Sequence, residues 1–187
     1  MKKCKGFTLI ELMVSVSILA LLSIIALPTF NHLIIQTRVD SEITQLHRLL
    51  LTARNFSINS SFIVTVCPLD NTNVCTTNWQ NEISVFTDFD SDKVYEPLLD
   101  EKIIRVKKAI KIGDTLEYGI GRNGVIYAPT GRLAGWGSNG TFKYCPENES
   151  EYSRGIRIAV SGRLYLSTDF DNDGRDELRD RTEITCR

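Results

Sequence analysis

Three features that enzymes and nucleic-acid-binding proteins commonly carry are absent from this sequence. It has two histidines, His32 and His47, and neither belongs to a Cys/His or Ser/His/Asp arrangement that would activate a nucleophile. No Gly-rich phosphate loop occurs, because Gly119, Gly121 and Gly124 are not followed by a helical pattern. The formal net charge is −1, which gives no global attraction for polyanions. The sequence therefore predicts no catalysis, and any binding of nucleic acid or anionic lipid would need a local patch.

Charge is also nearly missing from one long stretch close to the N-terminus. Residues 7–30 read FTLIELMVSVSILALLSIIALPTF and contain one charged side chain, Glu11. Because an apolar helix of about 20 residues crosses a bilayer core of about 30 Å, we expect residues 7–30 to form a transmembrane helix. A carboxylate in such a span costs roughly 2.5–3.5 kcal/mol, so Glu11 is expected to be functional and to have a partner. Pro28 lacks an N–H group and is expected to kink the helix.

A short basic leader, residues 1–6, precedes this span. Its three lysines place the N-terminus in the cytoplasm and the remainder of the chain beyond the membrane. Without the leader the chain has 19 basic and 23 acidic residues. A secretory signal peptide is the alternative, but its apolar core of about 7–15 residues would be shorter and would end at a small-residue cleavage site.

Residues 5–13, KGFTLIELM, resemble the cleavage site and first helix of type IV prepilins and type II secretion pseudopilins. The resemblance implies that a prepilin peptidase cuts after Gly6 and methylates the new amino terminus of Phe7. It also implies a partner for Glu11, namely the amino terminus of Phe7 on a neighbouring subunit of a filament. The expected partners are therefore this peptidase, the inner membrane, and other minor and major pilins or pseudopilins.

Closely spaced cysteine pairs of the CxxC type are missing, so a zinc site is not expected. Cys4 lies in the leader, and the mature chain keeps Cys67, Cys75, Cys145 and Cys186. An even number of cysteines in a domain that faces an oxidising compartment indicates disulfides. Cys67 and Cys75 flank the loop CPLDNTNVC and are natural partners, which leaves Cys145 with Cys186. The compartment that this predicts for the globular domain is the periplasm.

The rest of the chain predicts an α+β domain. Residues 31–59 continue as an amphipathic helix whose apolar face recurs every three or four residues, at Val39, Ile43, Leu46, Leu50 and Ala53. Residues 60–187 alternate β-branched and aromatic segments with turn residues such as Ser161-Gly162, which predicts a tight hairpin between the last two strands. The predicted strands are 61–67, 82–88, 102–106, 116–120, 125–128, 141–145, 156–160 and 163–167. We expect one long N-terminal helix packed on this antiparallel sheet domain, as in type IV pilins.

The order of these segments resembles the GspH/FimT family of minor pilins and pseudopilins. The resemblance is carried by Cys67-Pro68, Trp79, the run VFTDFDSD from Val85, residues 140–145 and residues 156–163. It implies a minor subunit near the filament tip that primes or caps assembly of a type IV pilus or a type II secretion pseudopilus. Cysteine pairs are commoner in the pilus members, which favours the type IV pilus over the alternative, type II secretion system protein H.

An acidic motif near the C-terminus has the spacing of a calcium-binding loop. Asp169, Asp171 and Asp173 fall at positions 1, 3 and 5 of an EF-hand-type loop, and Asp180 falls at position 12. Position 12 usually holds the longer glutamate, and no clear helices flank the motif. A solvated acidic turn that holds no metal is therefore the alternative to a Ca²⁺ site. A similar run at residues 88–92 lacks the glycine, which suggests that acidic turns recur in this domain.

FimT-type proteins of some bacteria bind incoming DNA through a Gly-Arg-x-Arg motif, which predicts a second alternative function, DNA uptake. Here Gly162-Arg163 is not followed by the second arginine. Arg154, Arg157 and Arg163 are the candidate DNA-binding residues, because phosphate binding needs concentrated positive charge. The segment from residue 154 to 187 carries seven arginines and seven acids, a balance that favours ordinary strands with polar outer faces.

Overall fold

The computed structural model describes residues 6–135 and 139–186, with the side chains of residues 24–29 excepted. The chain divides into two compact units, Met1–Thr37 and Arg38–Arg187. A long helix, α1 (Leu9–Ser60), begins in the first unit and ends in the second. The strands that the structure describes all belong to the second unit.

The first unit consists of the N-terminal part of α1, and its apolar side chains are exposed. Leu9 and Ile10, for example, are 78% and 70% exposed, because the described part of this unit has no second element to cover them. Among the residues that the structure describes, no helix is long and apolar enough to cross a membrane. The predicted span 7–30 and its kink at Pro28 include residues 24–29, whose side chains lie outside the description.

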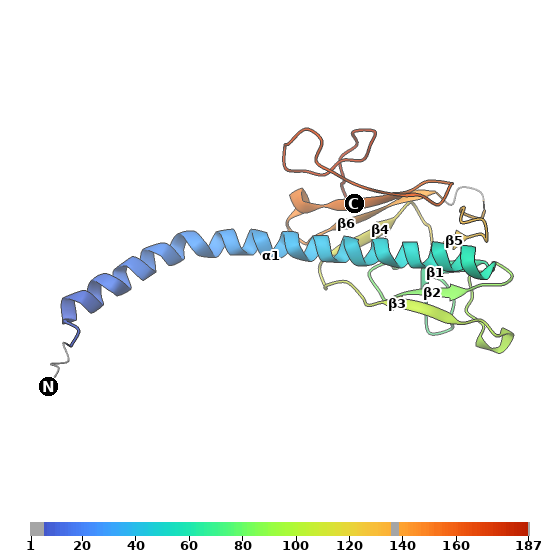
Figure 1. Cartoon of the computed structure of the whole chain (residues 1–187), viewed down its shortest axis with the longest axis horizontal. Coiled ribbons are helices and arrows are strands. Elements are labelled where there is room, and N and C mark those ends of the chain that lie inside the picture. The colour runs from blue at the N-terminus through green and yellow to red at the C-terminus, as the bar shows by residue number, and fades with distance from the viewer. Residues whose placement is uncertain (1–5, 136–138, 187) are drawn as a thin grey trace. The chain divides into compact units, whose positions relative to one another are not determined.

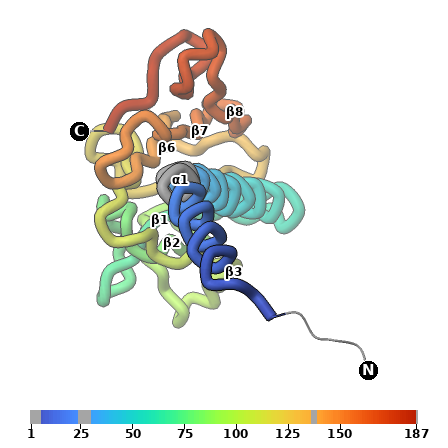
Figure 2. Tube along the Cα trace, turned by 90° about the vertical axis from the view of Figure 1, so that its left-hand side faces the viewer, coloured from blue at the N-terminus to red at the C-terminus, as the bar shows by residue number. Residues whose placement is uncertain are grey.

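In the second unit, α1 buries the face that the sequence predicts. All five of its expected apolar residues, from Val39 to Ala53, are buried. Leu49 is buried as well, at 1% exposed, so the apolar stripe is wider than the pattern predicted. Figures 1 and 2 show this part of the helix with strands on both of its sides, which explains the width of the stripe.

The strands form two four-stranded sheets in which every paired neighbour is antiparallel. The first sheet, in the order β3-β2-β1-β5, contains β1 (Val64–Pro68), β2 (Ile83–Thr87), β3 (Ile103–Lys107) and β5 (Val125–Tyr127). The second, in the order β4-β6-β7-β8, contains β4 (Thr115–Tyr118), β6 (Gly140–Cys145), β7 (Arg154–Ile158) and β8 (Leu164–Leu166). Two short 3₁₀ helices, η1 (Pro97–Leu99) and η2 (Ser150–Tyr152), lie in the connections.

Each predicted strand overlaps an observed one, and the α+β class is confirmed. The predicted hairpin between the last two strands is present, with the N–H of Gly162 donating to the carbonyl of Ala159 at 2.8 Å. The division into two sheets was not predicted. It arises because β5 returns to pair with β1, whereas β4 pairs with β6, which lies beyond β5 in the sequence.

An aromatic cluster and ion pairs hold the two sheets and the helix together. The indole of Trp79 lies edge-on to the rings of Tyr118 and Phe142, at centroid distances of 5.4 and 4.9 Å. Glu42 of α1 pairs with Lys107 of β3 at 2.5 Å, and this lysine side chain is 4% exposed. Because the lysine is buried, loss of its carboxylate partner would leave an uncompensated charge, which is strongly destabilising.

Candidate functional site

The N-terminal site comprises Gly6, Phe7 and the first turn of α1. Gly6 and Phe7 precede the helix, and Phe7 is 84% exposed. The carboxylate of Glu11 accepts hydrogen bonds from the backbone N–H and the hydroxyl of Thr8, at 3.1 and 3.0 Å. The N–H of Glu11 in turn donates to the Thr8 hydroxyl at 3.3 Å. The rest of the predicted leader, residues 1–5, lies outside the described residues.

Both disulfides expected from the sequence are present. Cys67 at the end of β1 is bonded to Cys75, with Cα atoms 5.5 Å apart. Cys145 at the end of β6 is bonded to Cys186, with Cα atoms 6.1 Å apart. The first bond closes a loop beside β1, and the second fixes the C-terminal segment to the second sheet. Each bond therefore tethers a segment that has little apolar surface of its own.

The three candidate DNA-binding arginines do not form one free basic patch. Arg154 and Arg157 are three residues apart on β7, so their side chains leave opposite faces of the strand. Arg154 pairs with Asp40 of α1 and lies 3.8 Å from Asp176. Arg157 pairs with Asp180 at 2.7 Å. The expectation that the arginines could cluster is thus wrong for this pair, because strand alternation separates them and acids neutralise both.

Tyr165, the aromatic residue beside these arginines that could stack on a base, is also occupied. Tyr165 of β8 lies directly opposite Arg157 in the strand pairing. The guanidinium of Arg179 lies over the Tyr165 ring, 4.1 Å from its centroid. These residues line a small pocket of about 240 Å³. The cation covers the face on which a base would stack, so this surface offers little room for single-stranded nucleic acid.

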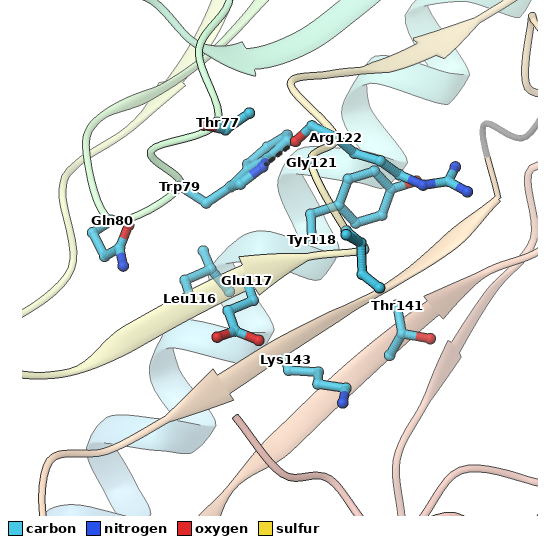
Figure 3. A pocket seen from close by; sticks show the side chains of 12 residues that line it. Thr77, Trp79, Gln80, Leu116, Glu117, Tyr118, Gly121, Arg122, Thr141 and Lys143 are labelled. Carbon is cyan, nitrogen blue, oxygen red and sulfur yellow. Dashed lines mark hydrogen bonds between the residues drawn. The ribbon is translucent and has the colours of Figure 1, made fainter. Parts of the chain in front are cut away.

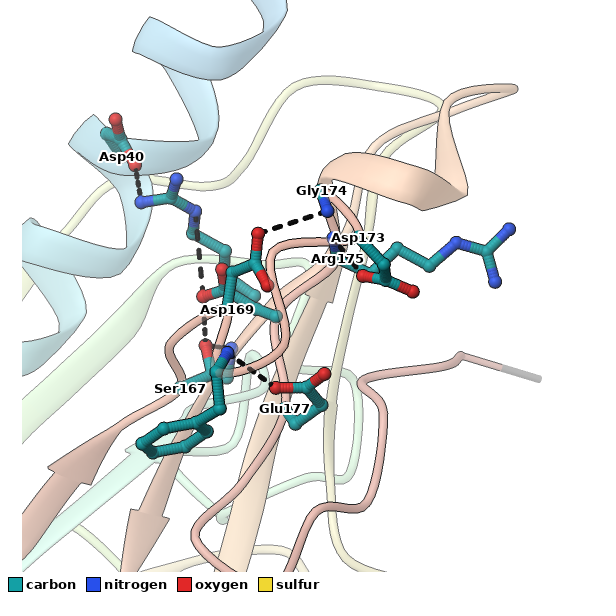
Figure 4. Close-up of polar contacts among 11 residues, drawn as sticks. Asp40, Ser167, Asp169, Asp173, Gly174, Arg175 and Glu177 are labelled. Atoms are coloured by element: carbon teal, nitrogen blue, oxygen red, sulfur yellow. Dashed lines mark hydrogen bonds and ion pairs between the residues drawn. The ribbon is translucent and has the colours of Figure 1, made fainter.

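The acidic motif forms a turn, and Figure 4 shows Asp169, Asp173 and Glu177 in it. Oxygens of Asp169, Asp171, Asp173 and Glu177 lie within 4.8 Å of one another. The prediction that Asp180 belongs to this group is wrong. Asp180 pairs with Arg157 instead, and Glu177 takes its place among the four carboxylates. The physical reason is that the bridge Thr168↔Glu177 folds the motif into a hairpin, which turns Glu177 toward the aspartates.

Backbone N–H groups already satisfy much of this turn. The two oxygens of Asp169 accept from the N–H groups of Asn172 and Gly174, at 2.7 and 3.0 Å. The N–H of Phe170 donates to Glu177 at 2.9 Å and lowers its pKa. Burial and the neighbouring Asp171 and Asp169 together outweigh that bond, and the pKa of Glu177 is raised. Backbone donors thus satisfy part of the turn, and calcium binding here stays a prediction.

Sequence reasoning missed a pocket of about 520 Å³ beside the edge strand β4 (Figure 3). Trp79 and Tyr118 form its aromatic wall, and the indole N–H donates to the carbonyl of Arg122 at 2.8 Å. Charged side chains of Glu117, Arg122 and Lys143 surround the opening. The pocket could not be predicted because its walls come from three separate parts of the sequence.

This fold and N-terminal site define a class of protein, the pilin-like filament subunits. Residues 1–27 match the prokaryotic N-terminal methylation motif, which indicates an inner-membrane-anchored subunit that a prepilin peptidase processes. Residues 42–162, more than half of the chain, match the type II transport protein GspH family. The chain belongs to this family. Its members are structural subunits, minor pilins and pseudopilins, rather than enzymes.

Two solved structures of one protein show the same fold at low sequence identity, and a third structure is less similar. The type IV minor pilin FimU of Pseudomonas aeruginosa is 15% identical, with a TM-score of 0.56 over 71% of this chain and 90% of FimU. A second crystal form of FimU gives a TM-score of 0.53 at 16% identity, over 69% of this chain and 92% of that one. The minor pseudopilin EpsH of the Vibrio cholerae type 2 secretion system gives 0.47 at 13% identity, over 69% and 95%. No curated protein sequence matches the chain.

Proposed function

We propose that this protein is a minor subunit that primes or caps assembly of a type IV pilus, with α1 as its assembly element. The observation that carries the proposal is the bare apolar surface of the first unit. Side chains such as Leu9, Ile10 and Leu21 are at least 66% exposed there, although they belong to one ordered helix. An apolar helix surface of this kind needs lipid or other helices to cover it. The membrane covers it before assembly and neighbouring subunits cover it in the filament.

Processing precedes assembly in this proposal. The peptidase cleaves between Gly6 and Phe7 and methylates the amino group of Phe7. Two features support this assignment: both residues lie before the helix begins at Leu9, and Phe7 is exposed. The peptide bond is therefore in irregular backbone that a peptidase can bind. Cleavage also places the new positive charge one residue before Thr8, next to the cap of α1.

Glu11 then pairs with the amino terminus of Phe7 on a neighbouring subunit. Both hydrogen bonds from Thr8 go to the same oxygen, Oε2. The other oxygen, Oε1, accepts no hydrogen bond among the described residues, so it is placed to receive the partner's ammonium group. A carboxylate in an apolar environment is stabilised strongly by such a pair, and much less by hydroxyl and amide donors alone.

The β-sheet unit lies in the periplasm before assembly and near the filament tip afterwards. The two disulfides support an oxidising compartment and favour the pilus over the secretion system. Arg154 and Arg157 each form an ion pair with an aspartate, which argues against DNA uptake as the main role. A secretion role is distinguished from a pilus role by the partners rather than by the fold.

The deciding experiment deletes the protein and scores surface pili, DNA uptake and exoprotein secretion in the same strain. We expect loss of piliation and twitching, restored by the wild-type chain and by Arg163→Gln. Loss of exoprotein secretion alone would instead assign the chain to a type II secretion system. Normal pili with abolished DNA uptake, which Arg163→Gln reproduces, would overturn the structural role in favour of a DNA receptor.

A further inference from the structure

The end of β2 and the loop that follows it hold a second group of carboxylates, separate from the C-terminal acidic turn. Asp88 follows the last residue of β2 and is completely buried, at 0% exposed. Its Oδ2 accepts from the Thr65 hydroxyl at 2.6 Å and from the N–H of Lys93 at 3.2 Å. Its Oδ1 is also buried, and it accepts no hydrogen bond from the residues that the structure describes. A buried, unpartnered carboxylate oxygen is costly, and such an atom commonly marks a bound water or ion.

Two surface aspartates face this buried carboxylate. One oxygen from each of Asp88, Asp90 and Asp92 lies within 4.8 Å of the other two. Oxygens that share one calcium ion, each about 2.4 Å from it, lie at most about 4.8 Å apart, so this spacing suits a common cation. Because Asp90 and Asp92 are exposed, an ion can reach the group from solvent.

Among the described residues, no cationic side chain neutralises this group. None of the three aspartates forms an ion pair with a side chain that the structure describes. The nearest lysine in the sequence, Lys93, instead donates its ammonium group to Asn123 at 2.8 Å. A further acid, Glu96, adds to the negative charge nearby. Burial raises the pKa of Glu96, and the charges of Asp92 and Asp90 raise it further.

The C-terminal acidic turn differs from this group in one respect. Both oxygens of Asp169 accept backbone N–H donors, and Glu177 accepts one as well. Among the described side chains, the buried carboxylate oxygen without a partner belongs to Asp88 alone. Among the described residues, the turn with the better sequence motif thus has no buried carboxylate oxygen without a partner, whereas the group that lacks the motif glycine has one.

We propose that Asp88, Asp90 and Asp92 bind a divalent cation of the calcium class. Asp88 is the buried anchor, Asp90 and Asp92 close the site at the surface, and water fills the remaining positions. All three ligand atoms are carboxylate oxygens with no sulfur or imidazole, which suits calcium better than zinc or copper.

The ion would order the surface that surrounds the site. Backbone hydrogen bonds already join the loop after β2 to the loop closed by the Cys67–Cys75 disulfide. The N–H of Cys75 donates to the carbonyl of Lys93 at 3.0 Å, and the N–H of Tyr95 donates to the carbonyl of Asn73 at 2.9 Å. A cation held by Asp88 and Asp92 would fix both loops as one surface. Calcium would in this way control the shape that this end of the domain presents to a neighbouring subunit.

The test uses the full chain in detergent micelles, stripped of metal with EDTA and titrated with CaCl₂. We expect a dissociation constant of about 10⁻⁴–10⁻³ M, typical of extracellular calcium modules, and a rise in Tm of a few degrees at about 10 mM calcium. Asp90→Asn and Asp92→Asn remove the charge but keep a side-chain oxygen that can accept the local backbone N–H groups. Each should weaken binding at least tenfold and remove most of the rise in Tm.

The matched control is Asp173→Asn in the C-terminal turn, which should leave the 88–92 response in place. Asp88→Asn removes the buried charge, so its Tm without calcium should equal or exceed that of the wild type, while its calcium response is lost. The proposal is overturned if 10 mM calcium does not change the wild-type Tm. It is also overturned if Asp90→Asn and Asp92→Asn respond as the wild type does, whatever Asp173→Asn shows.

Discussion

Thr8 and Glu11 cap the start of α1 reciprocally, each side chain bonding to the backbone N–H of the other. This Thr-x-x-Glu arrangement is a capping box, which satisfies two of the N–H groups that a helix end leaves without partners. Glu11 therefore has a capping role that the sequence interpretation did not include, beside the pairing role that it predicted. It caps its own helix through Oε2, and we propose that it also receives the amino terminus of another subunit.

Substitutions at Glu11 can separate these two roles. Glu11→Gln keeps an oxygen that can accept from Thr8 but removes the charge. Because only the charge attracts the partner's ammonium group, we expect Glu11→Gln and Glu11→Ala to reduce filament incorporation to the same extent. Thr8→Ala is the matched control, since it loses the cap hydroxyl and keeps the carboxylate. Co-purification with the filament measures the effect, and normal incorporation of Glu11→Gln would leave capping as the only role.

Processing at the N-terminus predicts a defined mature mass. Protein purified from native membranes should begin at Phe7 and carry one methyl group on its amino terminus. Intact-mass spectrometry measures both changes at once. A chain that keeps Met1, or one cut near Ala26 as a signal peptide would be, contradicts the assignment. Gly6→Leu should block cleavage more strongly than Gly6→Ala, because the peptidase site is expected to accept only a small residue.

The elements of this fold could be predicted from local pattern, because helix and strand periodicity depend on neighbouring residues. The face from Val39 to Ala53 and the hairpin at Ser161-Gly162 were both predicted in this way and are present. The sorting of strands into two sheets could not be predicted, since it depends on which distant strands pair.

The sites show the same contrast. The capping role of Thr8 was readable from the Thr-x-x-Glu spacing. The separation of Arg154 from Arg157 was not readable, because the predicted strand began at residue 156 whereas β7 begins at Arg154. The partner of Asp180 was not readable either, because Arg157 lies on a strand 23 residues away in sequence. The unpartnered oxygen of Asp88 is likewise visible only after the chain has folded around it.

The two disulfides should differ in their contribution to stability. Losing one typically costs about 2–5 kcal/mol, and in the chain-entropy account the cost grows with the length of the closed loop. The sequence separations are 8 for Cys67–Cys75 and 41 for Cys145–Cys186. We therefore expect the double variant Cys145→Ala/Cys186→Ala to lose more unfolding free energy than Cys67→Ala/Cys75→Ala. Urea unfolding of both variants decides the order, and free thiols in the wild-type chain would contradict the pairing.

The ion pair between Arg157 and Asp180 predicts a measurable pKa. The hydrogen bond from Arg157 is the main cause that lowers the pKa of Asp180, and Thr182 adds to it. Because the folded pKa is lower than the unfolded one, the pair stabilises the fold above the unfolded pKa, and this contribution is lost as pH falls through the folded value.

Arg157→Gln should raise the pKa of Asp180 toward the ordinary aspartate range in an NMR carboxyl titration. Arg163→Gln is the control and should leave the pKa of Asp180 unchanged, because Arg163 is not among the groups that shift it. The opposite result would be a pKa of Asp180 that changes with calcium but not with Arg157→Gln. Arg157 would then not be its partner, and Asp180 would again be a candidate ligand in the acidic turn.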